Sequence, residues 1–500
     1  MADEVSGVGG AWAGDVMGRK AHAKFLSAYI EKRMADSSGS LTVAIDAAWG
    51  AGKTFFITRW AEDLKSQKRG VIVFDAWKHD TSSDAVVGFM AELQRDMQLL
   101  REKVPATEKA AAQLKEYSTG MMKAMRKVVV PVSGALLAGV VKKGTGIAIS
   151  ELVEAVQGGE FDFDMNAIEA VGSKELEKSL DLFFKKTLEE HRSRGKATDT
   201  FRLALQMLVK QLREAQAIDG PLYVFVDELD RCRPDYAIKL LEGIKHLFAV
   251  PGVVFVISTN IEQLGNSVQA IYGPAFDGTG YLKRFFDFES DLPEPNNFAF
   301  AQTLFKSQPA YSERAIDHGL GLPQGDQESS NAKSFSLIAD AFDLPLRTQE
   351  RVYLMAAAAV VSIPINQSIA LIWLFFLCAL RQTRPLDFKA ASTLRLSIPA
   401  FDKLVKSISG LQGILLKVGG RYNREALSDV PLSAVLVTYY SFTVQTERAL
   451  GASYSGNDEP VFPASLLSEH LGHTVKINGE HRLALTNYYQ LVQSAGYLAT

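Results

Sequence analysis

The chain has 500 residues, about three times the length of a typical domain of roughly 150 residues, so two or three folding units are expected. Hydrophobic residues make up 47% and charged residues 22%, and 38 glycines and 17 prolines are too few for collagen or low-complexity disorder. With 54 Lys and Arg against 57 Asp and Glu, the net charge of −3 gives no strong signal for nucleic-acid binding. The two cysteines, Cys232 and Cys378, exclude a disulfide framework and a four-cysteine zinc site, and favour a reducing compartment such as the cytoplasm.

Four short apolar runs predict β-strands along the chain. They are LTVAID, VIVF, LYVFV and VVFVI, over residues 41–46, 71–74, 222–226 and 253–257. Continuous runs rich in β-branched and aromatic residues are typical of parallel strands that helices cover on both faces. The segment before these strands, residues 1–20, starts acidic and has no continuous apolar stretch, so we expect no secretory signal.

Helical periodicity dominates the rest of the chain and predicts its division into parts. Helical stretches fill the segment after the second strand, with only FDFD near Phe161 as a further strand candidate. A polar loop after Pro293 leads into further helical stretches, which predict a helical second domain. The predicted parts are a core over residues 1–88 and 217–300, a helical insertion over 89–216, a helical lid over 301–410, and a C-terminal region of unknown role over 411–500.

Two apolar stretches raise the question of membrane contact. Val128–Val141 (VVVPVSGALLAGVV) is shorter than the roughly 20 apolar residues that span a bilayer and contains Pro131, so a buried helix is favoured over membrane association. The second stretch, Ser368–Leu380 (SIALIWLFFLCAL), is equally short and predicts a buried core helix.

A glycine-rich loop stands between the first predicted strand and a predicted helix. Its sequence, AAWGAGKT over residues 47–54, has the context of a phosphate-binding P-loop, the Walker A motif. Such a loop wraps phosphates with backbone N–H groups, places Lys53 on the β- and γ-phosphates, and gives the Thr54 hydroxyl to Mg²⁺. Ala47 replaces the usual first glycine, which a backbone with negative φ tolerates. The candidate nucleotide-binding residues are Trp49, Gly50, Ala51, Gly52, Lys53 and Thr54.

A second acidic motif, LYVFVDELDRCRP, follows the third predicted strand and reads as Walker B. Asp227 at the strand end would hold Mg²⁺ through a coordinated water, so Thr54 and Asp227 are the candidate metal residues. The next residue, Glu228, would orient and deprotonate the attacking water, because hydrolysis needs a carboxylate near the γ-phosphate.

Each of the other polar residues near these motifs has a structural and a functional interpretation. Asp230, Arg231 and Arg233 form a salt-bridged helix start, or one of the arginines faces the nucleotide of a neighbouring subunit. Thr259 and Asn260 stand at the end of the fourth strand. They act as sensors of the γ-phosphate or the attacking water, or they only form the turn after the strand.

Together these segments resemble the KAP family of P-loop NTPases, within the additional-strand NTPases that include AAA+ and STAND proteins. The resemblance runs from Asp15 to Arg351, through GDVMGRKAHAKFLSAYI, AAWGAGKT, VFDAWKHD, VDELDRCRPD, VVFVISTN and YLKRFFDFESDLPEP. It implies an α/β fold class, a P-loop NTPase core with a mainly parallel sheet, a long helical insertion between Walker A and Walker B, and a helical C-terminal lid. Many family members carry membrane helices in the insertion, and Val128–Val141 is the candidate for one here.

The resemblance also implies roles for single residues. Where the family usually has two aspartates, this chain has Asp227 and Glu228, which favours hydrolysis. Arg284, or Lys283 beside it, becomes a candidate catalytic finger acting on a neighbouring subunit, and Arg347 a nucleotide sensor on the lid or an ordinary surface arginine.

Two further readings concern aromatic and histidine residues. Trp77 matches the family's aromatic residue after the second strand, and we expect it to pack in the core beside the P-loop. Glu469, His470 and His473 could ligate a metal, but Gly472 interrupts the helix and no fourth ligand is evident.

Three functions are compatible with these motifs. The leading hypothesis is a Mg²⁺-dependent ATPase that acts as a nucleotide-driven conformational or assembly switch, with ATP and Mg²⁺ as ligands and with a homo-oligomer as its form. Kinship with bacterial relatives implies a role in anti-phage defence, with other defence-system proteins as partners. The alternatives are a scaffold that binds ATP without hydrolysing it and a P-loop kinase, for which no acceptor-binding motif is visible.

Overall fold

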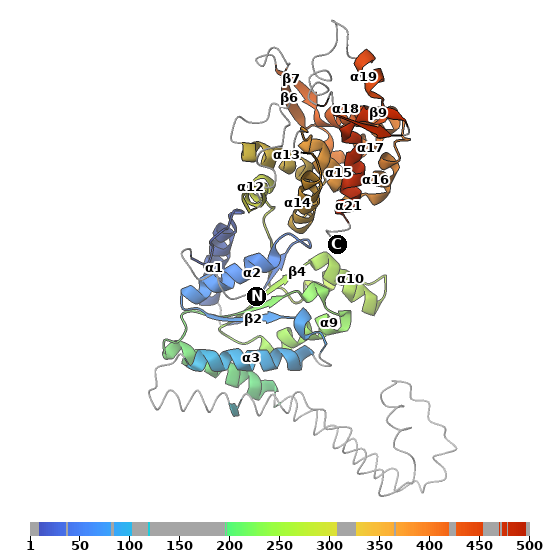
Figure 1. The fold of residues 1–500 in the computed structure, drawn as a ribbon. Helices are drawn as coiled ribbons and strands as arrows, with labels where there is room; N and C mark the ends of the chain where they lie inside the picture. The colour runs from blue at the N-terminus through green and yellow to red at the C-terminus, as the bar shows by residue number, and fades with distance from the viewer. Residues whose placement is uncertain are drawn as a thin grey trace, which may run out of the picture. The chain divides into compact units, whose positions relative to one another are not determined.

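A computed structural model of the chain has two compact units (Figure 1). The first comprises Met1–Ala13, Lys20–Ala47 and Lys53–Leu292, and the second Gly14–Arg19, Ala48–Gly52 and Pro293–Thr500. The structure describes residues 10–36, 39–81, 85–102, 119–120, 196, 198–307, 327–364, 367–419, 427–453, 470, 473–477 and 479–496.

The first unit is built on a five-stranded parallel sheet with the strand order β2-β3-β4-β1-β5. The four predicted strands are confirmed, and a fifth joins the edge beside β1. Their bounds are β1 (Leu41–Asp46), β2 (Gly70–Asp75), β3 (Leu222–Asp227), β4 (Val253–Thr259) and β5 (Phe288–Asp291). Because β1, β3 and β4 are parallel neighbours, their carboxyl ends lie together at one edge, where α/β proteins bind ligands.

Helices cover both faces of this sheet, as the continuous apolar strands predict. Val43, Phe225 and Val256 share one buried cluster with α1 and α2, whereas Val224 and Phe255 share another with α3, α9 and a helix over residues 198–214. Figure 1 shows α2 and α3 on opposite sides of β2. The helices of this unit include α1 (Arg19–Asp36), α2 (Lys53–Ser66), α3 (Ala85–Glu102), α9 (Pro234–Gly243), α10 (Ile261–Tyr272) and α11 (Gly278–Leu282).

The predicted insertion is described only at its two ends. There, α3 and the helix over residues 198–214 pack on the sheet through side chains such as Phe89, Phe201 and Leu208. The boundaries at 88 and 217 stay a prediction, while these flanking helices contribute to the core of the unit. The apolar stretch Val128–Val141 and the strand candidate near Phe161 lie outside the described residues. Within the described part of the chain, every helix is too short or too polar to cross a bilayer.

In its described residues the second unit is helical, with two pairs of antiparallel strands. One hydrophobic core runs from Ala301 to Ala495, so it contains residues of both the predicted lid and the predicted C-terminal region. The elements are α12 (Asn297–Ser307), α13 (Gln327–Ala341), α14 (Leu346–Val361), α15 (Leu371–Thr383), α16 (Pro385–Ser392), α17 (Ile398–Lys406), β6 (Leu415–Gly419), β7 (Leu427–Pro431), α18 (Leu432–Val444), α19 (Glu447–Ser453), β8 (Thr474–Ile477), β9 (Glu480–Leu483) and α21 (Tyr488–Ala495).

Helix α15 is the centre of this core. Every residue from Leu371 to Leu380 is fully buried, so the helix is surrounded on all sides. Trp373 stacks on Phe376 and on Tyr439 of α18, with ring centroids 5.5 Å and 6.0 Å apart. An all-apolar helix of this length is stable only when protein covers every face. The predicted buried core helix is therefore confirmed.

A buried histidine lies beside the same core. His470 is only 3% exposed, its Nε2 has no hydrogen-bond partner among the described residues, and its ring lies 6.1 Å from that of Tyr439. Burial, followed by the nearby His473, lowers the pKa of His470 to about 4. The neutral ring is therefore the form that fits the folded state.

This histidine should make the second unit sensitive to mild acid. Because the folded pKa lies below the ordinary value of about 6.5, the unfolded state binds the proton first, so stability is full above pH 6.5 and falls as the pH drops toward 4. Between pH 7 and pH 5 we expect a loss of about 2 kcal/mol in unfolding free energy. Urea unfolding followed by hydrogen exchange of α18 should show this loss in the wild type and in the exposed-site control His481→Gln, but not in His470→Gln. Equal acid sensitivity in all three proteins would contradict the assignment.

Candidate functional site

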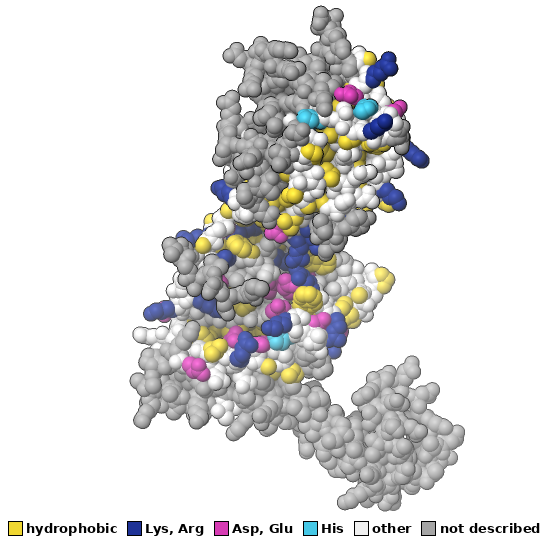
Figure 2. All heavy atoms as spheres, in the orientation of Figure 1, with side chains coloured by type: hydrophobic (Ala, Val, Ile, Leu, Met, Phe, Trp, Pro, Cys, Tyr) yellow, Lys and Arg dark blue, Asp and Glu magenta, His cyan; other side chains and the backbone are white. Residues whose placement is uncertain are grey.

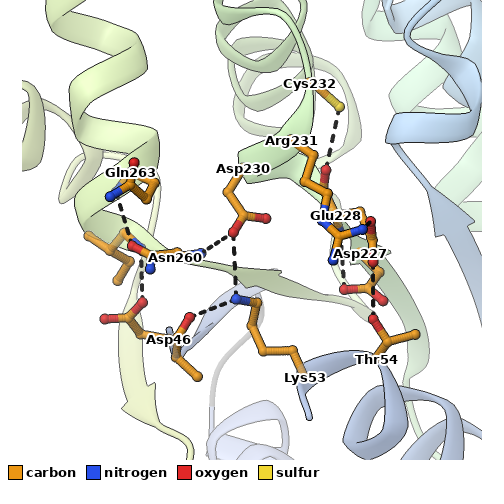
Figure 3. Close-up of polar contacts among 12 residues, drawn as sticks. Asp46, Lys53, Thr54, Asp227, Glu228, Asp230, Arg231, Cys232, Asn260 and Gln263 are labelled. Atoms are coloured by element: carbon orange, nitrogen blue, oxygen red, sulfur yellow. Dashed lines mark hydrogen bonds and ion pairs between the residues drawn. The ribbon is translucent and has the colours of Figure 1, made fainter. Parts of the chain in front are cut away.

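The predicted motifs meet at the carboxyl edge of the sheet. β1 ends at Asp46 and leads into the glycine-rich loop, β3 ends at Asp227, and β4 ends at Thr259. Figure 3 shows Lys53 and Thr54 from the start of α2 pointing toward the acidic residues that follow β3. The structure thus brings Lys53, Thr54, Asp227 and Glu228 together, as the two motifs predict.

The glycine-rich loop has the backbone that a phosphate loop requires. Gly50 and Gly52 have φ values of 82° and 90°, a region that residues with a Cβ rarely adopt. Ala47 is not among the residues with positive φ, so alanine is tolerated there as expected. Lys53 begins α2 directly after the loop, so the N–H groups and partial positive charge of a helix N-terminus adjoin it. Trp49 is half exposed at the surface of the loop.

Lys53 is held by groups from two other segments. Its Nζ donates to the carbonyl oxygen of Ala47 at 2.6 Å and lies 3.5 Å from Asp230 Oδ2. The side chains of Lys53 and Asp230 are 9% and 1% exposed, so this ion pair is almost entirely buried. Asp230 also accepts the backbone N–H of Asn260 at 3.0 Å and thereby links β3 to β4. These contacts fix the ammonium group of Lys53 next to the loop.

Asp227 and Thr54 are the two predicted magnesium ligands. Asp227 is buried at the end of β3, and its Oδ1 accepts the backbone N–H of Glu228 at 3.0 Å. Burial raises the pKa of Asp227, whereas the neighbouring hydroxyls of Ser258 and Thr54 act in the opposite direction. A buried carboxylate that is hard to ionise gains from a nearby cation.

Glu228 adopts a strained backbone conformation. Its φ of 62° lies in the left-handed region, which is uncommon for a residue with a side chain and is found where a site imposes it. Glu228 is the N-cap residue of the short helix η2 (Leu229–Arg231), and Cys232 Sγ donates to the carbonyl oxygen of Glu228 at 3.6 Å. Burial also raises the pKa of the Glu228 carboxyl, with Arg231 acting against the shift. A raised pKa suits a group that must take up a proton.

The donor set fits a magnesium ion. The described residues contain no group of three His, Cys, Asp or Glu arranged to hold a metal. Mg²⁺ bound with a nucleotide needs only one or two protein ligands, because phosphates and waters supply the rest. The Thr54 hydroxyl and the buried Asp227 carboxylate match this requirement.

The arginines near Walker B make contacts within the chain. Arg233 donates from Nε to Asp80 Oδ1 at 3.2 Å and from Nη2 to the Asp80 carbonyl oxygen at 2.6 Å, which favours the salt-bridged reading. Arg231 forms an ion pair with Glu228. Arg284 lies exposed after α11 with its guanidinium 5.6 Å from the centre of the Tyr281 ring, and Lys283 is also exposed. A finger role for Arg284 or Lys283 remains a prediction.

The remaining candidate sensors are placed as follows. Asn260 caps α10, since its Oδ1 accepts the backbone N–H of Gln263 at 2.9 Å, which is the turn role. Thr259 is fully buried, and its hydroxyl has no hydrogen-bond partner within the described residues. Arg347 lies exposed at the start of α14 in the second unit. Sensor roles for these residues remain predictions.

The expectation for Trp77 was wrong. Its side chain is 55% exposed rather than buried, because β2 ends at Asp75 and the chain turns outward into the short helix η1 (Trp77–His79). Asp75 Oδ1 accepts the backbone N–H of Lys78 at 3.0 Å and fixes this turn. The ring of Trp77 instead lies 5.7 Å from the guanidinium of Arg231.

Sequence reasoning missed the contacts that three residues make at the site. Asp230 is the partner of Lys53, and Asp46 accepts the N–H of Ile261 at 2.8 Å and so fixes the start of α10. Arg19, only 2% exposed, donates from Nη2 to the Ala51 carbonyl oxygen of the loop at 3.3 Å. Arg19 lies in the GRK segment before the first strand. The sequence signal that could have identified it is a basic residue close to the start of a helix.

The visible face of the first unit carries mixed charge. Figure 2 shows lysine or arginine side chains next to acidic ones across the middle of that face. This alternation agrees with the net charge of −3. Neither sign dominates the face.

Comparison with known proteins places the chain in a family. Residues 19–317, more than half of the chain, match the model of the KAP family P-loop domain, and no curated protein matches. Among solved structures, the chain is similar to the Aeropyrum pernix ORC2 protein in ADPNP and ADP complexes, at 12% identity and a TM-score of 0.32, with 96% of this chain and 94% of that chain covered. It is also similar to C. elegans PCH-2, at 12% identity and a TM-score of 0.28, with 72% of this chain and 68% of that chain covered. The match over residues 19–317 shows that the chain belongs to the KAP family of P-loop proteins.

Proposed function

We propose that this protein is a Mg²⁺-dependent ATPase. The observation that carries the proposal is the convergence of Lys53, Thr54, Asp227 and Glu228 at the carboxyl edge of one parallel sheet. Binding of a triphosphate needs Lys53 and Thr54. The metal ion needs the Thr54 hydroxyl and the Asp227 carboxylate, and hydrolysis needs Glu228.

Different residues of the chain have different roles in the proposed hydrolysis. The loop N–H groups and Lys53 bind and orient the phosphates, and the preset geometry of Gly50 and Gly52 lowers the cost of doing so. Bound Mg²⁺ would neutralise charge that develops on the phosphate oxygens. Glu228 orients a water and takes its proton, for which its raised pKa is suited.

The same site argues against the two alternative functions. A non-hydrolysing scaffold has no need of a strained glutamate beside the metal-binding aspartate, since nucleotide binding requires only the loop and Asp227. A kinase would use a group that accepts a proton from a bound acceptor substrate. Glu228 beside Asp227 is better suited to accept a proton from the attacking water.

We further propose that ATP turnover drives a conformational or assembly switch. Arg284 and Lys283 are exposed, so either could enter the site of a neighbouring copy, and Arg347 at the start of α14 could respond to the nucleotide from the second unit. An anti-phage role in concert with other defence proteins is a proposal that rests on family kinship.

Phosphate release measured across a wide dilution series tests both hydrolysis and assembly. If Arg284 acts between subunits, the specific activity should rise with protein concentration, and Arg284→Ala should abolish this rise. Lys239→Ala, an exposed lysine on α9, serves as the control.

A mixing experiment makes the test sharper. Arg284→Ala and Glu228→Gln should each be nearly inactive, but a mixture should recover turnover at interfaces that combine Glu228 of one copy with Arg284 of the other. Constant specific activity on dilution, without recovery on mixing, would remove the finger role. Absence of phosphate release at every concentration would remove the ATPase itself.

A further inference from the structure

Arg231 connects the catalytic carboxylate to an exposed tryptophan. On one side its guanidinium forms an ion pair with Glu228, three residues earlier across the single turn of η2. On the other side it lies over the ring of Trp77, 5.7 Å from the ring centre. The sheet register explains this proximity, because Asp75 of β2 pairs with Asp227 of β3, and η1 and η2 both follow directly.

Both carboxylate oxygens of Glu228 are engaged in this arrangement. Oε1 accepts the Thr54 hydroxyl at 3.2 Å, and Oε2 faces the Arg231 guanidinium, as Figure 3 shows. While the Thr54 hydroxyl and the guanidinium face these two oxygens, neither oxygen is directed at an attacking water. The observed geometry is therefore that of a resting base.

We propose that Arg231 is a positioning residue that restrains Glu228, and that Trp77 holds Arg231 in the restraining position. This proposal rests on the proposed ATPase function. Release requires the guanidinium to leave Oε2. Turnover in the resting protein is then limited by this ion pair.

The chain contains a matched control for the same pair of contacts. Arg59 on α2 lies 5.4 Å from the ring centre of Phe55 and 3.3 Å from Glu62, again three residues away. That pair is on an exposed helix surface, and neither Arg59 nor Glu62 belongs to the candidate site. Loss of a comparable arginine can therefore be separated from loss of the restraint.

Steady-state ATPase kinetics test the proposal. Arg231→Ala and Trp77→Ala should each raise kcat roughly threefold to tenfold with little change in KM, because the restrained step follows binding. Arg231→Lys and Trp77→Phe keep the charge or the ring and should return kcat toward the wild-type value. Arg59→Ala should leave both constants unchanged, and Arg231→Ala should give no gain when Glu228→Gln is also present. A kcat that falls or stays constant in Arg231→Ala would overturn the restraint.

A second measurement judges the contact without relying on turnover. The fluorescence of Trp77 is obtained as the difference between a protein and the same protein with Trp77→Phe. Quenching of this signal by acrylamide should be greater in Arg231→Ala than in the wild type, because the guanidinium no longer covers the ring. Unchanged quenching would refute the contact with Trp77. If no variant and no wild-type sample releases phosphate, the proposed hydrolysis fails, and increased quenching would still support Arg231 as the group held by Trp77.

Discussion

Replacing Lys53 with alanine should weaken ATP binding by at least about a hundredfold and abolish turnover, because a charge-assisted contact to the phosphates is lost. The structure adds a reason for so large an effect. Lys53 is already held in place between the Ala47 carbonyl oxygen and Asp230, so little side-chain freedom has to be lost when nucleotide binds. Titration with a fluorescent ATP analogue, together with phosphate release, measures both quantities.

The control for this variant must separate binding from folding. Removing Lys53 leaves the Asp230 carboxylate buried without its ion-pair partner, which itself destabilises the first unit. Thermal unfolding should therefore accompany the titration, and Lys65→Ala, an exposed lysine in the last turn of the same helix, should behave as wild type. Wild-type affinity in a folded Lys53→Ala protein would mean that the glycine-rich loop does not hold phosphate.

Much of the nucleotide unit could be predicted from sequence because its signals are local. Each of β1 to β4 is a continuous apolar run, and burial on both faces of a parallel sheet requires that pattern. The edge strand β5, with the sequence FESD, escaped prediction because it is short and only its Ser290 is buried. The loop was recognisable because Gly50 and Gly52 supply a backbone that other residues rarely adopt.

The contacts around the site could not be predicted because they depend on how neighbouring strand ends are placed. Asp230 reaches Lys53 only because η2 turns the chain back toward α2 after β3. Trp77 was expected in the core on the basis of its size and apolar character, but one short turn after Asp75 carries it to the surface. Composition and periodicity do not encode such turns. They also do not encode the φ of 62° at Glu228, which decides where its carboxylate points.

Glu228→Gln should separate hydrolysis from binding. The amide keeps the size of the side chain and can still accept the Thr54 hydroxyl, but it cannot take up the proton of the attacking water. We expect kcat to fall by about a hundredfold to a thousandfold, while the affinity for ATP stays within roughly threefold of the wild type. Single-turnover phosphate release and the same nucleotide titration measure the two effects.

The matched control for this variant is Glu289→Gln, an exposed glutamate on β5 that should leave both values unchanged. Because glutamine carries no charge, Glu228→Gln also removes the ion pair with Arg231, but turnover should still fall, since that ion pair restrains only Glu228 itself. Wild-type turnover in Glu228→Gln, beside an inactive Lys53→Ala, would assign the water-activating role to a different residue and remove Glu228 from the catalytic set.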